Sequence, residues 1–443
     1  MKPLRAPIPF LLPALFLLPT LLLLPSCGGE SADDPEAQAS VASSEAPAEP
    51  EIFSDVPEAQ AAYDESRELW GTDGWASLAK LKEAIELDPD FTEAHALLGM
   101  RYAYVHQTYD RSDSIADQAL GFAETALEME PENAMAINAM GNYFYRVEKD
   151  YPKAVEYFSR GAALYPDQTV FVRMQAHAAR RAGDWDQALA LLQRSEEMEP
   201  SLDAIQAIAE NHLYNRRWDQ AEAAYQEHAR RAPEGTMGPS NLAWIEFDRT
   251  GETGAVREFL ASRPTGWAGD RWNLEMLDRD YEAALAAMGY FEGDILRGQY
   301  GIHPKAYYQG VALRWMGDEA GATAAFQDAR GIMEGMLPAL DDDCRVHAGL
   351  GDVYAALGMR DEAVAAATRA TEVMPVEKDA LTGTHNHLAL ARVYSVLGEP
   401  GPAVEQIRYL MSVPSGLNMW DLRKAPVWDP IRDDPAFQAI LEE

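Results

Sequence analysis

The chain has 443 residues and a formal net charge of −35, with 72 acidic and 37 basic side chains. Such an excess of acid repels a polyphosphate backbone, so the sequence predicts no nucleic-acid partner. Alanine, leucine and glutamate dominate, and no segment alternates apolar and polar residues convincingly. We therefore expect an all-α fold with almost no strand.

The first residues have the layout of an export leader. A short basic start at Lys2 and Arg5 is followed by an apolar run that ends in the sequence LLPSC at Cys27. This pattern resembles a bacterial lipoprotein signal, and the resemblance implies that residues 1–26 are removed and that Cys27 carries lipid. The alternative is an uncleaved anchoring helix, which the prolines of the leader disfavour.

The same resemblance implies a location. Two or three acyl chains attach a protein stably to a bilayer, so we expect the membrane as a partner through this anchor. Gly28 stands where an aspartate would resemble an inner-membrane retention signal. We therefore expect the bacterial cell envelope, on the periplasmic face of the outer membrane. Residues 27–52 add to the cysteine a stretch rich in alanine, serine, proline and glutamate, which predicts a disordered acidic tether.

A pattern of small and aromatic residues then returns about every 34 residues. It is clearest in residues 345–375, and prolines that would end helices recur in steps of 33 to 35 residues at Pro131, Pro166, Pro200 and Pro233. The pattern resembles the tetratricopeptide repeat, a helix-turn-helix unit. Because one helical pair cannot bury its own apolar face, we expect a right-handed superhelical solenoid of about ten pairs, shaped as a long curved ribbon.

The clearest repeat also shows how a pair is built. Gly351, Ala363 and Ala370 are small enough for two antiparallel helices to approach closely, Gly358 opens the turn between them, and Pro375 stops the second helix.

The repeats divide the chain into an N-terminal array (53–237), degenerate helical repeats (238–300), a C-terminal array (301–416) and a capping tail (417–443). The second pair, at 92–131, carries an insertion, HQTYDRSDS, that we expect to form a loop on one face, and the third has one extra turn residue. Between 238 and 300 we expect helices but cannot pair them. In the tail, Asp434 precedes a short helix whose apolar residues, Phe437, Ile440 and Leu441, are expected to cover the end of the stack.

Residues 92–166 and 345–441 also resemble the repeat regions that many bacterial proteins attach to a kinase, a nucleotide cyclase or a winged-helix domain. This chain has no Gly-rich phosphate loop with its lysine, no HRD-type catalytic loop, no GxSxG elbow and no HExxH sequence. We therefore expect a non-catalytic interaction array without a cofactor or a metal site.

The repeat resemblance implies a concave surface formed by the first helix of each pair. Partner contacts are then expected from the third pair at Asn138, Asn142 and Arg146, and from the fourth pair at Arg173, His177, Arg180 and Arg181. Arg173, His177 and Arg181 follow at intervals of four, so they line one strip of a helix and should attract a carboxylate of a partner. The alternative is that these cations neutralise acids of their own and adjacent repeats.

Three other positions invite a chemical interpretation. Cys344 is interpreted as a structural thiol at the start of a repeat helix. The three aspartates at 341–343 are interpreted as an N-terminal cap of that helix. His385 and His387 stand two apart on a predicted helix, so they point to different sides and cannot chelate one metal ion together.

These observations predict a lipid-anchored scaffold that binds a peptide or a segment of a partner protein in its groove. The rival hypothesis is a structural subunit of an envelope assembly, and a third is a cryptic enzyme with its site in residues 238–300.

Overall fold

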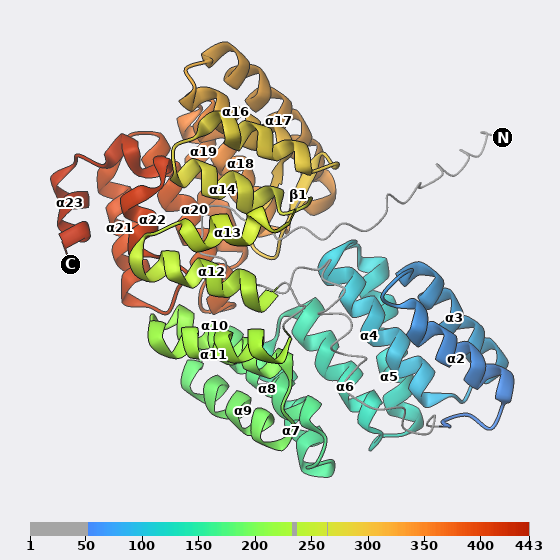
Figure 1. Ribbon diagram of the computed structural model, residues 1–443. Coiled ribbons are helices and arrows are strands. Elements are labelled where there is room, and N and C mark those ends of the chain that lie inside the picture. The colour runs from blue at the N-terminus through green and yellow to red at the C-terminus, as the bar shows by residue number, and fades with distance from the viewer. Residues whose placement is uncertain (1–51, 233–236, 264, 443) are drawn as a thin grey trace, which may run out of the picture.

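The computed structural model describes residues 52–232, 237–263 and 265–442. The expected signal, the lipidated Cys27, the tether up to residue 51 and Pro233 lie outside these ranges. Within them the chain is an all-α solenoid, as predicted, and its helices form ten consecutive pairs (Figure 1). Every helix in the described part of the chain is too short or too polar to cross a bilayer.

The first five pairs form the first array. They are α2 (Pro57–Leu69) with α3 (Gly74–Leu87), α4 (Thr92–Thr108) with α5 (Asp113–Met129), α6 (Ala134–Tyr143) with α7 (Tyr151–Leu164), α8 (Thr169–Arg181) with α9 (Trp185–Met198), and α10 (Leu202–Tyr214) with α11 (Trp218–Arg231).

The region in which no pairs were predicted continues the solenoid with two shorter pairs. These are α12 (Met237–Thr250) with α13 (Gly254–Ala261), and α14 (Ala268–Leu277) with α15 (Tyr281–Ala287), followed by the 3-10 turn η2 (Met288–Tyr290). Their tryptophans, Trp244 and Trp272, are almost fully buried in the core. The pattern weakens in sequence because large aromatic residues here take the place of the small residues of the other pairs.

The second array follows a short antiparallel hairpin of β1 (Ile295–Arg297) and β2 (Ile302–Pro304), in which Leu296 pairs with His303. The array consists of α16 (Lys305–Trp315) with α17 (Glu319–Leu340), α18 (Cys344–Ala356) with α19 (Arg360–Val373), and α20 (Ala380–Val396) with α21 (Pro400–Ser412). The tail forms α22 (Met419–Lys424), the 3-10 turn η3 (Pro426–Ile431) and α23 (Pro435–Glu442). The tail caps the stack as predicted, since α23 packs on α21 with Phe437 and Ile440 fully buried.

The pair of α18 and α19 shows why the repeat residues are needed. A methyl group on Gly351 would lie only 2.9 Å from Cβ of Ala367, so the two helices pack at a distance that only glycine allows. Gly358 has φ of +72° in the turn, and α19 ends at Val373, just before Pro375. Each of these positions behaves as the sequence predicted.

Two local predictions need correction or detail. The insertion in the second pair does not form a long loop: it lengthens α4 and α5 to 17 residues each and leaves only residues 109–112 between them. The extra residue of the third pair is taken up by a π-helical turn, η1 (Phe144–Glu148), that ends at Lys149 with φ of 54°.

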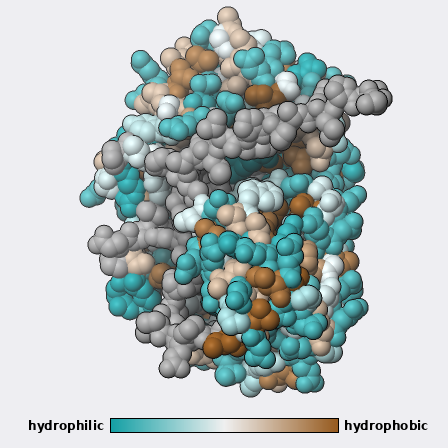
Figure 2. Space-filling model, turned by 90° about the vertical axis from the view of Figure 1, so that its right-hand side faces the viewer, coloured by the Kyte–Doolittle hydropathy of each residue, from teal (hydrophilic) through white to brown (hydrophobic). Residues whose placement is uncertain are grey.

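The largest correction concerns shape. We expected an open ribbon, but the second half of the chain folds back on the first, so that α20 contacts α8 and α22 contacts α12. In Figure 1 the first array lies below in blue and green, and the second array and tail lie above and beside it in yellow to red. The face shown in Figure 2 is mostly hydrophilic where it is coloured, with small hydrophobic groups between, as expected for so acidic a chain.

Candidate interaction surfaces

Three of the predicted contact residues form a ladder along α6 and η1. Asn142 donates from Nδ2 to Oδ1 of Asn138 at 3.0 Å, and Arg146 donates from Nε to Oδ1 of Asn142 at 3.1 Å. Arg146 also bonds Gln107 of α4 and lies over the rings of Tyr104 and Tyr145. Since residues four apart stack along a helix, the sequence spacing places these side chains in one row.

The predicted cations of α8 face acids on the next first helix, α10. Arg173 pairs with Asp203 at 2.8 Å, His177 lies 3.8 Å from the same carboxylate, and Arg180 pairs with Glu210 at 2.8 Å. Burial of Asp203 opposes its ionisation, but His177 and Arg173 outweigh that effect and lower its pKa to about 2. For these cations the structure matches the alternative that they neutralise acids of an adjacent repeat.

Arg181 has a partner from the other end of the chain. Its Nη1 donates to Oδ2 of Asp379 at 2.9 Å, and the same oxygen accepts the hydroxyl of Tyr151 at 2.7 Å. Oδ1 of Asp379 meanwhile caps α20 by accepting the backbone N–H groups of Leu381 and Thr382. Burial opposes ionisation, yet Arg181 and these donors hold the pKa of Asp379 below its ordinary range. The strip does bind a carboxylate, and that carboxylate belongs to the chain itself.

Similar contacts join the two halves at intervals along the molecule. Arg111, in the loop of the second pair, lies 3.3 Å from Asp343, the N-cap of α18. Arg216 donates to the backbone oxygens of Leu410 and Val413 and to Oγ of Ser415.

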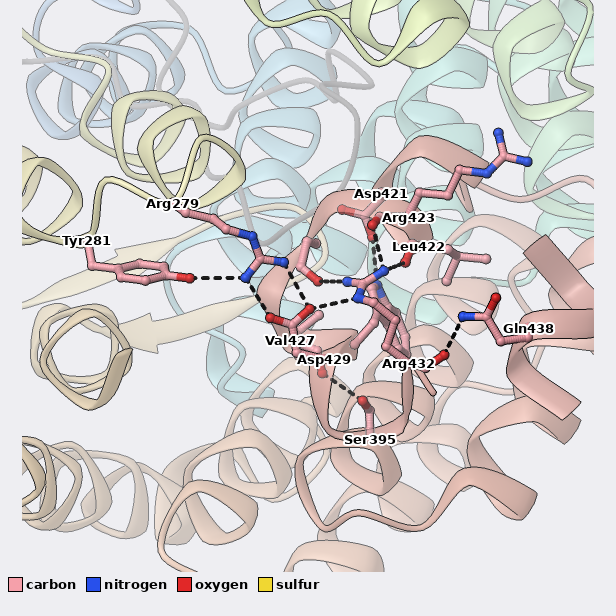
Figure 3. A network of polar contacts seen from close by, with 12 residues as sticks. Arg279, Tyr281, Ser395, Asp421, Leu422, Arg423, Val427, Asp429, Arg432 and Gln438 are labelled. Atoms are coloured by element: carbon pink, nitrogen blue, oxygen red, sulfur yellow. Dashed lines mark hydrogen bonds and ion pairs between the residues drawn. The ribbon is translucent and has the colours of Figure 1, made fainter. Parts of the chain in front are cut away.

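A further contact, between the turn that follows α14 and the tail, is drawn in Figure 3. Arg279 donates to both carboxylate oxygens of Asp429, which in turn accepts from Arg432. Asp343, which pairs with Arg111, caps α18 as predicted. It is in addition an ion-pair partner of a residue more than 200 positions earlier in the chain.

Arg216 and Arg279 occupy a special backbone position. Each stands two residues past the last residue of a first helix and has φ of 56° or 62°. The same position in other pairs is taken by glycine, as at Gly183, Gly317 and Gly358. A left-handed conformation costs a residue with a side chain about 1–2 kcal/mol. Here each side chain bonds a segment at least 150 positions further along the chain, which offsets that cost.

The inner surface of the second array is occupied by the chain's own hairpin. His303 of β2 lies 3.0 Å from Asp352 of α18, and Arg392 of α20 donates to the same oxygen at 3.1 Å. At the hairpin tip, Tyr300 stacks on His385 with 3.7 Å between ring centroids. Burial lowers the pKa of His385 to about 4, so this ring is neutral at physiological pH. His385 thus packs against the hairpin. Nδ1 of His387 lies 2.8 Å from Oε1 of Gln406, within hydrogen-bond distance.

The predicted residues therefore separate into two groups. Arg180, Arg181, His177 and Asn142 are buried, whereas Asn138, Arg146 and Arg173 stay partly exposed. Sequence reasoning missed Asp379, Tyr151 and the hairpin. Asp379 has the signature of a helix cap, but nothing in the sequence links it to Arg181. Cys344 is 2% exposed and makes packing contacts, as expected of a structural thiol.

No family model matches the sequence, and no curated protein matches it. Solved structures share parts of the arrangement. TTC0263, a thermophilic TPR protein of Thermus thermophilus, aligns with 43% of this chain and 99% of its own, at 17% identity and a TM-score of 0.38. The type IV pilus biogenesis factor PilW aligns over 46% and 91%, at 19% and 0.39. Human IFIT1, solved with PPP-AAAA, aligns over 80% and 72%, at 14% and 0.41. At these values the likeness lies in the stacking of helical pairs, and the function must be argued from this chain's own residues.

Proposed function

We propose that the protein is a non-catalytic interaction scaffold, anchored to a bacterial envelope membrane through lipid on Cys27, that binds an acidic segment of a partner protein along α6 and α8. The observation that supports this most is Arg146. It is partly exposed and, among the described residues, it pairs with no carboxylate, although the chain carries 72 acidic side chains. A cation left without an acid in such a protein is suited to an acid from outside.

The neighbours of Arg146 fit the same ligand. Asn142 and Asn138 add amide groups one and two turns before it on the same face, and Arg173 lies on the adjacent first helix with 18% of its side chain exposed. A carboxylate bound by Arg146 would be within the reach of amide donors. Side chains of this kind can hold an extended segment without a deep pocket. Arg180 and Arg181 lie deeper and hold the fold together.

The partner site is tested by reversing charge at Arg146 and Arg173 in one variant, with both residues changed to glutamate. The matched control is Arg369→Glu on α19, an exposed arginine whose neighbour is Glu372. In cells that carry a photo-crosslinking residue at position 138, we expect a crosslinked partner with the natural protein and with the control, and none with the double variant. Unchanged crosslinking in the double variant, with circular dichroism intact, would refute the site.

The anchor is tested separately with Cys27→Ser. We expect this variant to incorporate no labelled fatty acid and to leave the membrane fraction on mild extraction, while the natural protein stays in it. A serine variant that remains membrane-bound would exclude lipid as the anchor and leave the partner site unaffected.

A further inference from the structure

Lys149 occupies a costly backbone position without a side-chain partner that offsets the cost. It ends η1 with φ of 54°, in the left-handed region. At Arg216 and Arg279, which have a similar φ, the side chain makes hydrogen bonds to a distant segment. The ammonium of Lys149 forms no hydrogen bond or ion pair within residues 52–232, 237–263 and 265–442. Nothing in this part of the chain therefore explains a lysine where glycine would be less strained.

The ammonium of Lys149 lies among charged groups from distant segments. Burial and the nearby Arg111 lower its pKa to about 8, so most of it is still charged at neutral pH. Asp343 and Asp379 are close enough to favour the charged form, but neither forms an ion pair with it. A partly desolvated charge without a counterion in contact costs free energy, and an anion from outside would recover part of that cost.

The two carboxylates near Lys149 are already in use. Asp343 accepts from Nε and Nη2 of Arg345 at 3.0 and 2.8 Å, and it caps α18. Asp379 accepts from Arg181 at 2.9 Å and from backbone N–H groups at the start of α20. A move of either carboxylate to Lys149 would break these bonds, so the ammonium is left to a ligand.

Two arginines beside Asp343 also have unused donors. Nη1 of Arg111 lies 3.3 Å from Asp343, and its other N–H groups have no acceptor among the described residues. Arg297, at the end of β1, is exposed and bonds no carboxylate of the described chain. It is held nearby because Arg345 donates to the backbone oxygen of Gly298 at 2.9 Å. Two segments thus add free donors around the same aspartate.

This group of cations favours a compact anion with several oxygens. Donors that come from three segments suit the oxygens of a phosphate group, which point in different directions, better than the two oxygens of a carboxylate. A phosphate monoester also carries nearly two negative charges at neutral pH. The net charge of −35 repels anions only at long range, because salt screens charges beyond about 8–10 Å. Asp110 and Asp342 at the edge are exposed, so solvent weakens their repulsion.

We infer that Lys149, Arg111 and Arg297 bind a phosphate dianion, either free phosphate or the phosphate group of a small monoester. The ligand can reach them, because Lys149 and Arg111 are partly exposed and Arg297 is exposed. The site joins the end of η1, the loop between α4 and α5, and the hairpin. It does not depend on the proposed partner site, in which Arg146 and Arg173 bind an acidic segment.

The inference is tested first on the mature natural protein, by calorimetry near neutral pH. The probes are inorganic phosphate, glycerol 3-phosphate, dimethyl phosphate, which has a single charge, and acetate. We expect dimethyl phosphate and acetate to bind at least about ten-fold more weakly than inorganic phosphate, since each offers fewer charges and acceptors. Tighter binding of glycerol 3-phosphate than of inorganic phosphate would identify a monoester as the ligand, and the reverse order would identify free phosphate. No binding of either dianion at millimolar concentrations, or equal binding of dimethyl phosphate, would overturn the inference.

Variants then locate the site. Lys149→Gly removes the ammonium and relieves the backbone, so we expect a melting temperature without ligand at least as high as that of the natural protein. We expect it to bind phosphate about ten-fold more weakly, whereas Lys149→Arg keeps most of the affinity. Lys149→Asn, which also tolerates a left-handed backbone, should behave as the glycine variant does.

The matched control is Lys153→Ala, which removes an exposed positive charge of α7 and should leave phosphate binding unchanged. Phosphate binding that survives both Lys149→Gly and Lys149→Asn would exclude Lys149 and overturn the inference. Crosslinking from position 138 should persist in Lys149→Gly, so the failure of this site and the failure of the partner site can be told apart.

Discussion

Arg181 and Asp379 lie 198 positions apart in the sequence, and Nη1 of the arginine donates to Oδ2 of the aspartate at 2.9 Å. Their side chains are 6% and 1% exposed. Removing one member of a buried ion pair leaves the other charge uncompensated, which costs about 3–5 kcal/mol. We expect Asp379→Ala to lower the free energy of unfolding by that amount, measured by chemical denaturation.

The pH dependence of this pair has a defined sign. Because the pKa of Asp379 is lowered in the folded state, its contribution is complete at neutral pH. It is lost as the pH falls below the ordinary carboxyl value of about 4. The control is the exposed pair of Arg360 and Asp361, for which a double-mutant cycle should give a much smaller coupling because solvent screens the two charges. A similar small value for Arg181 and Asp379 would show that the two halves are not held together here.

A second prediction concerns Arg216, whose φ is 56°. Glycine would relieve the backbone cost of about 1 kcal/mol, but it would remove all three hydrogen bonds to residues 410–415. We expect Arg216→Gly to be destabilising by about 1–2 kcal/mol, since charged donors contribute more than the backbone relief. Hydrogen exchange at the Ser415 N–H, which donates to Tyr214, should become faster.

The control for this prediction is Arg216→Lys, which keeps the charge and the backbone strain but cannot reach three acceptors at once. We expect it to lie between the natural protein and the glycine variant in melting temperature. A glycine variant more stable than the natural protein would mean that the hydrogen bonds from Arg216 to residues 410–415 contribute nothing to stability.

Two buried aspartates, Asp270 and Asp421, predict a loss of stability as the pH rises from about 4 to about 7. Burial raises the pKa of Asp270 and of Asp421 to about 7, against an unfolded value of about 3.9. Since the folded pKa is the higher one, these groups cost nothing below about pH 4, destabilise the fold progressively as the pH rises from about 4 to about 7, and cost no more above that. Asparagine keeps an oxygen for the indole N–H of Trp244 or Trp428. We expect Asp270→Asn and Asp421→Asn each to gain up to about 4 kcal/mol on the natural protein between pH 4 and pH 8.

The measurement is the free energy of unfolding of each variant at both pH values. The comparison within one variant removes any constant effect of the substitution on packing. A difference from the natural protein that stays the same at both pH values would mean that neither carboxyl titrates in the folded state as inferred.

The hairpin provides a fourth prediction, from a matched pair of glycines. A methyl group on Gly349 of α18 would collide with the backbone oxygen of Ile302 in β2, whereas one on Gly331 of α17 would meet open space. We expect Gly349→Ala to displace residues 295–304, with faster hydrogen exchange there and a lower melting temperature. Gly331→Ala should raise stability by up to about 1 kcal/mol, because alanine is the better helix former. Equal effects would place the hairpin away from α18.

The sequence predicts the solenoid well because each pair obeys a local rule. Gly351, Gly358 and Pro375 act within one repeat, so their spacing alone indicates the close helix contact, the turn and the helix end. The cap at Asp434 and the buried face of α23 are local in the same sense. These features could be read from about 34 residues at a time.

The candidate site could be predicted only in part. The spacing of Arg173, His177 and Arg181 predicts a strip that attracts a partner's carboxylate. In the structure this strip pairs with Asp203 and Asp379 of the chain itself, and spacing cannot say whose carboxylate it is. Asp379 is one of many acids in the chain, and its selection depends on how the turns of the solenoid meet. The hairpin at 295–304 was missed for a related reason. Its strands are three residues long, and they are held by Asp352 and Arg345 of a distant helix instead of by their own pattern.

A solenoid whose successive superhelical turns do not contact one another extends elastically, because each interface between neighbouring helical pairs can open slightly. Here Arg181, Arg216 and Arg279 each form hydrogen bonds to a segment much later in the chain. Extension of the solenoid must break these bonds. We therefore expect the molecule to resist a force applied at its two ends until these hydrogen bonds break. Once these contacts break, we expect the molecule to lengthen abruptly and not gradually.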